Sequence, residues 1–285
     1  MHSLLITHGY PNLDSEGASK EAFIFFGDFI EKKVKISLIV IENKKNFSAN
    51  IGNTKFKRQL KKKFKNKVNL YTLKLNNNFF YNILKFLYRF IFCKPENFFE
   101  TAKKKEIETL IEKINPDFFI NFFNQPAAST YEVKNIPFYN YCGIPPHLVE
   151  PIRQNNLIYD LNLKNLFKLI NSLIYNKLVK KIYKKMFWNA EISFLSSPDT
   201  YSFFKKNSKG HVVKTNNITK NSFKIKNLKK KNCLIMIGNL KATFTHEGLI
   251  QLSENLINEL VLLRKKIKFN LKIIGHFEPT SKIKE

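Results

Sequence analysis

The stretch Cys233-Leu-Ile-Met-Ile-Gly-Asn-Leu240 is a short apolar run with a glycine near its end, and such a run predicts a buried β-strand. After it, leucines recur at helical spacing over residues 249–263, and residues 269–274 form a second apolar run before Gly275. A strand, a helix and a strand joined by short loops predict a βαβ unit with two parallel strands. Because so small a unit cannot bury both faces of a sheet, we expect it either to extend a sheet formed upstream or to continue into further sequence.

The composition is that of a globular chain. With 285 residues, 44% of them hydrophobic, the chain is long enough for one large domain or two modest ones. Its three cysteines, Cys93, Cys142 and Cys233, are too widely spaced to predict a disulfide framework or a zinc motif. The amino-terminal residues lack the regions of a secretory signal peptide, so we expect a cytoplasmic location.

The formal net charge of +27 suggests a polyanionic partner. Only four of the 49 basic residues are arginines, however, and arginine is the residue that base edges and bidentate phosphate contacts favour. Abundant Lys, Asn, Phe and Ile together are what the codons of an AT-rich genome give without selection for function. The main functional alternative is attraction to anionic lipid, and binding of nucleic acid is not favoured.

The first forty residues predict a βαβ unit. Residues 2–8 are expected to form a strand, residues 20–32 a helix and residues 34–41 a second strand. The loop between the first strand and the helix contains Gly9 and Gly17, and backbone N–H groups at such a helix start can hold an anion. No G-x-G-x-x-G motif is present, so a dinucleotide fingerprint is not supported, and Gly17 could equally only relieve crowding.

Strands and helices continue to alternate along the chain. Further strands are expected at residues 68–75, 117–123, 138–142, 189–196 and 211–215, and helices at residues 103–114 and 157–188, with a short helix capped by Ser197. This order predicts an α/β fold with a Rossmann-like parallel sheet. We expect an amino-terminal domain over residues 1–221, a linker over residues 222–231, and an incomplete carboxy-terminal Rossmann-like domain over residues 232–285.

A lysine-rich and aromatic segment runs from Lys55 to Phe92. Its lysine-rich beginning is expected to be a solvated helix face or a loop. Its end, residues 79–92, is apolar on nearly all sides but is too short and too often interrupted to span a bilayer. Two interpretations remain open for this end: a buried helix, or an interfacial helix whose preceding lysines contact an anionic membrane surface.

Several motifs together resemble the GT-B glycosyltransferases, specifically the large retaining family 4, over essentially the whole chain. The motifs are Leu4-Leu-Ile-Thr-His-Gly-Tyr-Pro11 with Gly17-Ala-Ser19, Asn115-Pro-Asp-Phe-Phe-Ile120, Ala190-Glu-Ile-Ser-Phe-Leu-Ser-Ser197, Val212-Val-Lys-Thr-Asn-Asn217, and Leu234-Ile-Met-Ile-Gly-Asn-Leu240 followed by Gly248-Leu249 and Leu271-Lys-Ile-Ile-Gly275. The last group resembles the opening of the family's donor-binding domain.

The resemblance implies transfer of a sugar from a nucleotide-sugar donor to a polysaccharide or lipid-linked acceptor, in the cleft between two Rossmann-like domains. It implies a cytoplasmic enzyme, peripheral on the inner membrane face, that needs no metal because backbone amides, helix ends and basic side chains hold the donor phosphates. The strand ends and the resemblance place Gly9, Gly17, Ala18, Ser19, Asn121, Asn124 and Gly143 on the acceptor side of the cleft. They place Gly238, Asn239, Leu240 and Gly275 on the donor side.

The sequence departs from the family pattern in three places. Asn121-Phe-Phe-Asn124 stands where many members carry histidines, and Asn239 follows the glycine where members carry Arg and Lys. The paired glutamates that grip the donor are expected only beyond Glu285, so the chain is expected to be a fragment. The catalytic residues stay unassigned, with His147, after two prolines, as a weak candidate.

Two other classes of function remain open beside the glycosyltransferase. The first is a non-catalytic, basic, membrane-associated or assembly protein derived from such an enzyme. The second is a nucleic-acid-binding protein, for which only the charge argues, because no arginine-rich recognition helix or aromatic RNA-binding strand is present.

Overall fold

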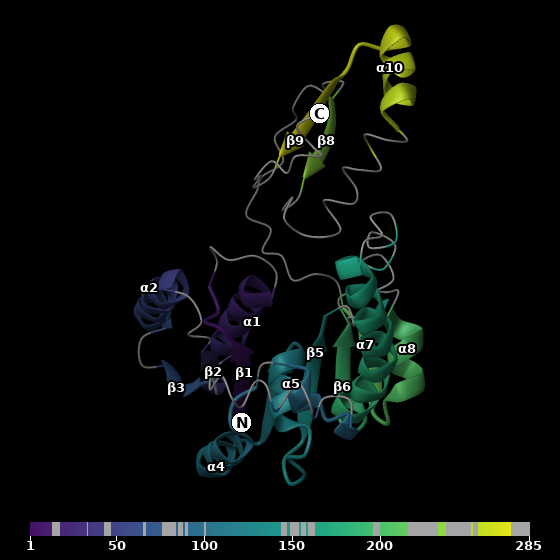
Figure 1. Ribbon diagram of the computed structural model, residues 1–285. Coiled ribbons are helices and arrows are strands. Elements are labelled where there is room, and N and C mark those ends of the chain that lie inside the picture. Colours follow the sequence, from purple (N-terminus) through teal and green to yellow (C-terminus); the bar gives the residue numbers. More distant parts are fainter. Residues whose placement is uncertain are drawn as a thin grey trace. The chain divides into compact units, whose positions relative to one another are not determined.

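The structure is a computed structural model. It describes residues 1–12, 18–32, 34–42, 47–64, 67–75, 84, 88, 91–99, 101–143, 147–148, 154, 158, 163–195, 200–215, 233–237, 252 and 256–274. Contacts between residues divide the chain into two compact units, Met1–Lys220 and Asn221–Glu285, and each unit is described by itself (Figure 1).

Strands and helices alternate through the first unit. Its elements are β1 (His2–His8), α1 (Ala18–Glu31), β2 (Lys35–Glu42), α2 (Phe47–Phe64), β3 (Val68–Lys74), the 3-10 helix η2 (Pro95–Asn97), α4 (Lys104–Ile114), β4 (Phe118–Phe122), α5 (Asn124–Thr130), β5 (Phe138–Cys142), α7 (Leu163–Phe187), β6 (Ile192–Leu195), α8 (Tyr201–Asn207) and β7 (His211–Lys214). The strands form one parallel sheet in the order β3-β2-β1-β4-β5-β6-β7. The predicted α/β class with a Rossmann-like parallel sheet is confirmed.

Helices cover both faces of this sheet, as a parallel sheet requires. On one face, Phe23 and Phe26 of α1 and Leu60 of α2 pack against apolar side chains of β1, β2, β4 and β5. On the other face, α4 covers β1, β2 and β4, while α5, α7 and α8 pack over β5 and β6. The middle residues of β1 and β2 are therefore buried without a break, and this explains why their sequences are continuous apolar runs.

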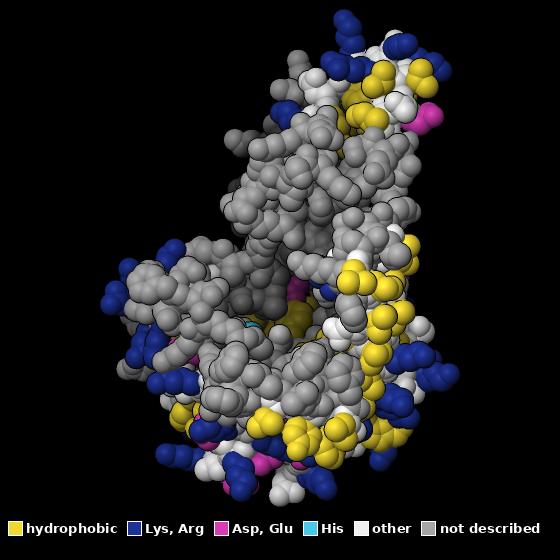
Figure 2. Space-filling view, in the orientation of Figure 1, with side chains coloured by type: hydrophobic (Ala, Val, Ile, Leu, Met, Phe, Trp, Pro, Cys, Tyr) yellow, Lys and Arg dark blue, Asp and Glu magenta, His cyan; other side chains and the backbone are white. Residues whose placement is uncertain are grey.

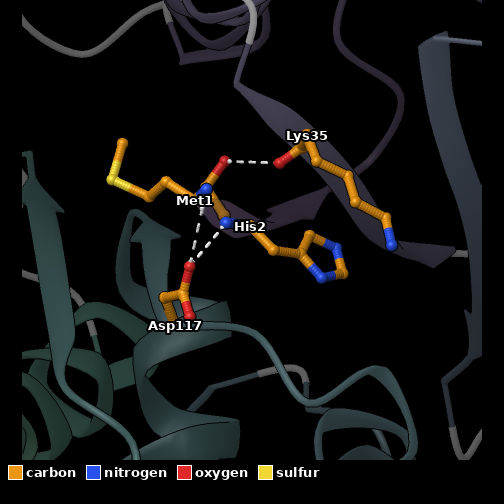
Figure 3. Close-up of polar contacts among 5 residues, drawn as sticks. Met1, His2, Lys35 and Asp117 are labelled. Atoms are coloured by element: carbon orange, nitrogen blue, oxygen red, sulfur yellow. Dashed lines mark hydrogen bonds and ion pairs between the residues drawn. The ribbon is translucent and has the colours of Figure 1, made fainter.

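The amino-terminal edge of the sheet is held by backbone contacts between β1, β2 and the residue before β4 (Figure 3). The Lys35 N–H donates to the Met1 carbonyl at 3.2 Å, and the Asp117 N–H donates to the His2 carbonyl at 2.9 Å. In return, the His2 N–H donates to the Asp117 carboxylate at 2.7 Å, and the Met1 ammonium group lies 4.0 Å from it. The amino terminus is thereby fixed between its two neighbouring strands.

Helix α4 ends as its sequence predicts. Asn115 adopts the left-handed conformation, with φ of 46°, and its N–H donates to the Ile111 carbonyl at 2.9 Å. Asparagine is one of the few residues other than glycine that adopt this conformation readily, and the proline that follows cannot continue a helix. The Asn-Pro pair thus turns the chain into β4.

Two expectations for helices need correction, and a third is only partly covered by the described residues. The short helix after β6 begins at Tyr201 with Thr200 as its N-cap, and Thr200 makes no side-chain capping bond; Ser197 lies outside the described residues. The long helix is described from Leu163 to Phe187, and residues 157 and 159–162 of the expected range lie outside the described residues. The described residues of the 79–92 segment, Leu84, Tyr88, Ile91 and Phe92, are all exposed, so a buried helix is wrong at these positions.

The second unit contains a parallel βαβ unit, as predicted. Strand β8 (Cys233–Ile237) pairs with β9 (Asn270–Ile274), and α10 (Ile257–Lys266) lies between them in sequence. The two strands form a sheet of their own, so the expectation that they could extend the first sheet is wrong. The predicted linker residues 222–231 lie outside the described part of the chain.

Within the described ranges, no helix combines the length and the apolar content that crossing a bilayer requires.

Substitutions at two glycines, Gly210 and Gly27, test the packing of the first unit. A Cβ at Gly210 would collide with the backbone carbonyls of Ala190 and Glu191, whereas a Cβ on Gly27, inside α1, would meet nothing within 4 Å. We expect Gly210→Ala to lower the free energy of unfolding by about 2 to 3 kcal/mol. Gly27→Ala should raise it by up to about 1 kcal/mol, because alanine is the better helix former.

Urea unfolding followed by the fluorescence of Trp188, the single tryptophan of the chain, measures both changes in the first unit. Equal effects of the two substitutions would contradict the packing of residues 209–211 against residues 188–191.

Candidate functional site

The order of the strands creates a switch point between β1 and β4. The chain moves from β1 to β2 and β3 on one side, and then crosses β1 to build β4, β5, β6 and β7 on the other. Loops that leave the carboxyl ends of the two central strands therefore diverge, and in open α/β sheets ligands bind in the crevice that this divergence opens. We call the residues at the carboxyl ends of β1, β4 and β5, together with the first turns of α1 and α5, the switch-point site.

The loop after β1 begins with a turn that requires glycine. Gly9 has a φ of +81°, its N–H donates to the Ile41 carbonyl of β2 at 3.0 Å, and its carbonyl accepts from the Thr7 hydroxyl at 3.0 Å. A side chain at this φ would be strained. Gly9 therefore directs the chain back over β2.

Two buried polar residues hold the continuation of this loop. The Tyr10 hydroxyl lies 2.5 Å from a Glu42 carboxylate oxygen and 3.1 Å from the Thr72 hydroxyl, which ties the loop to the ends of β2 and β3. Burial, and then the bond to Glu42, raises the pKa of Tyr10 to about 12. The Asn12 amide donates to the Tyr10 carbonyl at 3.0 Å. These bonds hold residues 9–12 in place on the β2 side of the switch-point site.

At the end of β4 the backbone takes an unusual conformation. Phe123 has a φ of 72° and a ψ of −168°, a region that is almost restricted to glycine and costs about 1 to 3 kcal/mol for other residues. The surroundings impose it, because the Phe123 N–H still pairs with the Tyr141 carbonyl of β5 at 2.9 Å while its carbonyl accepts from Ala127 in α5. One residue thus ends a strand and starts a helix.

The Phe123 ring fills the space that Gly143 leaves at the end of β5. A Cβ at Gly143 would lie 2.8 Å from the Phe123 ring, and the ring also meets Tyr141 edge-on at 5.7 Å between centroids. The expected residues Gly9, Asn124 and Gly143 follow the ends of three adjacent strands, β1, β4 and β5. Phe123 lies between the ends of β4 and β5 and forms the floor there.

A carboxyl group faces a tyrosine hydroxyl at the same edge of the sheet. Glu21, in the first turn of α1, is half-buried, and burial raises its pKa above the ordinary value. It lies close to the Tyr141 hydroxyl, whose pKa is raised to about 12, first by burial and then by the charge of Glu21. The Tyr141 side chain is only 2% exposed, and its hydroxyl group interacts with Glu21 and with Thr215, so Tyr141 backs the carboxyl group from inside the protein.

Asn121 does not border the crevice, although it was expected there. It is fully buried, its amide donates to the Asn140 side chain at 2.9 Å, and its carbonyl oxygen accepts from the Thr130 hydroxyl at 3.0 Å. Because both halves of its amide are used inside the protein, Asn121 joins β4, β5 and α5 and is not available to a ligand.

His147, the weak catalytic candidate, is 8% exposed and lies among aromatic rings. Its ring centroid is 4.5 Å from that of Phe203 in α8 and 5.9 Å from that of Tyr183 in α7. Burial, and then the charge of Lys180, lowers its pKa to about 4, so the imidazole is neutral at pH 7. Neither ring nitrogen has a hydrogen-bond partner among the described residues. These surroundings suit a packed side chain better than a general base.

The remaining expected residues are only partly visible. Ala18 and Ser19 form the start of α1, while Gly17 and the donor-side residues Gly238, Asn239, Leu240 and Gly275 lie outside the described residues. Among the residues that the structure describes, no three His, Cys, Asp or Glu side chains are grouped so that they could hold a metal ion.

Sequence reasoning missed Glu21, Tyr141 and Phe123. An acidic residue in a first helical turn is an ordinary favourable choice at the positive end of the helix dipole, so Glu21 gave no distinct signal. Tyr141 belongs to a predicted strand, and nothing in a phenylalanine predicts a positive φ. Only the pairing of the strands brings these residues to one place.

A scan against protein-family models and a search of the curated proteins both found no match to this sequence. The fold and the site therefore carry the functional argument.

A double-mutant cycle tests the contact between Phe123 and Gly143. Gly143→Ala should lower the free energy of unfolding by about 1 to 3 kcal/mol, because the ring must move away from the new methyl group. In a Phe123→Ala background the same change should cost almost nothing. Urea unfolding measures both, and additive costs would contradict the contact.

His147 predicts a pH dependence of stability. Its pKa falls from 6.5 in the unfolded chain to about 4 in the folded chain, so the unfolded state binds the proton preferentially as the pH drops. The free energy of unfolding should thus decrease by about 3 kcal/mol between pH 6.5 and pH 4, with most of the stability retained above pH 6.5.

The His147→Leu variant supplies the control, because it keeps an apolar side chain in place and removes the titration. Measured by urea unfolding from pH 7 to pH 4.5, the free energy of unfolding of the wild type should fall steadily relative to that of the variant as the pH falls. Parallel curves would show that His147 is not buried in its neutral form.

Proposed function

We propose that this protein is a glycosyltransferase of GT-B type, which transfers a sugar from a nucleotide-sugar donor to a polysaccharide or lipid-linked acceptor. The observation that carries the proposal is the switch-point site, in a seven-stranded parallel sheet that is followed in sequence by a second parallel βαβ unit. The sequence motifs at β1, β4, β6 and β8 agree with it.

We propose a separate binding role for each of the two units. The switch-point site of the first unit binds the acceptor, and the glycine-ended strand β8 opens the part of the chain that binds the donor. In the reaction, an acceptor hydroxyl oxygen forms a bond to the anomeric carbon while the bond from that carbon to the diphosphate oxygen breaks, and the hydroxyl proton passes to the departing diphosphate. Backbone N–H groups and lysines stabilise the departing nucleoside diphosphate.

We assign Glu21 to the acceptor, with Tyr141 as the buried residue that positions it. A half-buried carboxylate makes strong, charge-assisted hydrogen bonds to sugar hydroxyls, and the hydrogen bond from the buried Tyr141 hydroxyl group holds the Glu21 side chain in place. Phe123 and Gly143 supply an apolar floor beside them, against which the face of a sugar ring can pack. The combination of a flat apolar surface with one carboxyl group suits a neutral polyhydroxylated ligand.

The test measures release of nucleoside diphosphate by the full chain from a panel of nucleotide sugars, with simple alkyl glycosides as acceptors. Glu21→Gln should lower kcat/KM for the acceptor by about 10- to 100-fold, because one charge-assisted hydrogen bond is lost. The affinity for the donor should stay unchanged.

Asp28→Asn is the matched control. Asp28 lies on the same helix and undergoes the same change of charge, but it is exposed and two turns farther from the site. Absence of both donor binding and diphosphate release across the panel would overturn the proposed function. Equal effects of Glu21→Gln and Asp28→Asn would overturn only the role of Glu21 and would leave the proposed function standing.

A further inference from the structure

Helix α7 exposes apolar side chains along its amino-terminal half. Leu163, Leu166, Ile170, Leu173 and Ile174 are between 38% and 75% exposed. In the space-filling view, hydrophobic side chains form a column over α7, and Lys or Arg side chains gather at its lower end (Figure 2). Such a column is unusual on a surface that meets only water.

The same side of the helix continues into lysines. At about 100° per residue, the five apolar residues and Lys177, Lys180, Lys181 and Lys184 fall within an arc of about 120°. A groove of about 540 Å³ lies among these lysines, and Ile174 and Leu178 contribute apolar walls to it. The outward face of α7, which we define as these nine residues, is therefore apolar at one end and cationic at the other.

The charge of this face is not balanced by its own helix. Helix α7 contains seven lysines and no acidic residue. In the part of the chain that the structure describes, none of the four groove lysines forms an ion pair, and Lys184 lies over the Trp188 ring at 5.2 Å. The ammonium groups thus remain available to an anionic partner.

The opposite side of α7 explains how the helix is held. Val179, Ile182, Tyr183, Met186 and Phe187 are buried in the core against α5 and α8. The fold therefore needs the carboxy-terminal half of the helix and its inward side. Among the described residues, the buried clusters of the core include none of the outward apolar side chains.

We propose that the outward face of α7 binds the surface of a bilayer that contains anionic phospholipid. Leucine and isoleucine side chains enter the boundary between headgroups and acyl chains, and the lysines at the other end contact the phosphates. A nucleic acid would use the lysines but would leave the apolar column exposed to water, so the joint pattern favours lipid. The inference does not depend on the proposed transferase activity.

The test is co-sedimentation of the full chain with vesicles of phosphatidylcholine that contain phosphatidylglycerol or lack it. Because each surface lysine contributes roughly fivefold to partitioning onto an anionic bilayer, Lys177→Glu with Lys181→Glu should weaken binding at least about 25-fold. Leu166→Ser with Ile170→Ser should weaken it roughly tenfold, even at high salt. All four side chains are exposed, so the variants should keep the wild-type unfolding curve.

Two control variants test whether net charge alone, or the 55–92 segment, accounts for binding to the vesicles. Lys61→Glu with Lys62→Glu changes the charge by the same amount on α2, and Leu84→Ser with Ile91→Ser removes exposed apolar groups from the 55–92 segment. Both should bind vesicles as the wild type does. Equal losses in the α7 and control variants, or no binding to anionic vesicles, would overturn the proposal. So would poly(U) binding that the α7 lysine variant abolishes while vesicle binding persists.

Discussion

The structure depends on one constraint: every inner strand of a parallel sheet must be covered on both faces. In β1 and β2 the central residues are buried on both sides, so a helix has to lie above and another below each pair of strands. Helices α1 and α2 satisfy this on one face, and α4, α5, α7 and α8 satisfy it on the other. To reach both faces the chain must wind outward from β1 in two directions. The switch point, and with it the site, is a consequence of that winding.

This constraint also explains which features the sequence predicts well. Buried parallel strands are continuous apolar runs, and they are easy to recognise when helices of amphipathic or polar sequence separate them. The strands at His2–His8 and Phe138–Cys142 were therefore predictable almost to the residue, as was the end of α4 at Asn115. The 79–92 segment was harder, because an apolar helix has the same composition whether its partner is a core or a lipid surface.

The site was less predictable than the fold, because its chemistry comes from residues that meet only after the strands pair. Glu21 and Tyr141 are 120 positions apart, and only the placement of α1 over β5 brings the carboxyl group to the hydroxyl group. Asn121 shows the opposite error. A polar residue near a strand end was expected to reach the ligand, but its side chain points to the α5 face of the sheet, where Thr130 and Asn140 occupy it.

This buried asparagine has a further consequence for the site. Asn121, Asn140 and Ser193 are consecutive partners across β4, β5 and β6, and all three are buried on one face. A slip of one residue in either pairing would move an amide onto the apolar α1 face, where it would lose its hydrogen bonds, so the polar row fixes the register. The register in turn sets Phe123, two residues after Asn121, beside Gly143, three residues after Asn140. The hydrogen bond from Thr130 to Asn121 holds α5 against β4. The strain at Phe123 persists because this network holds the strand before it and the helix after it.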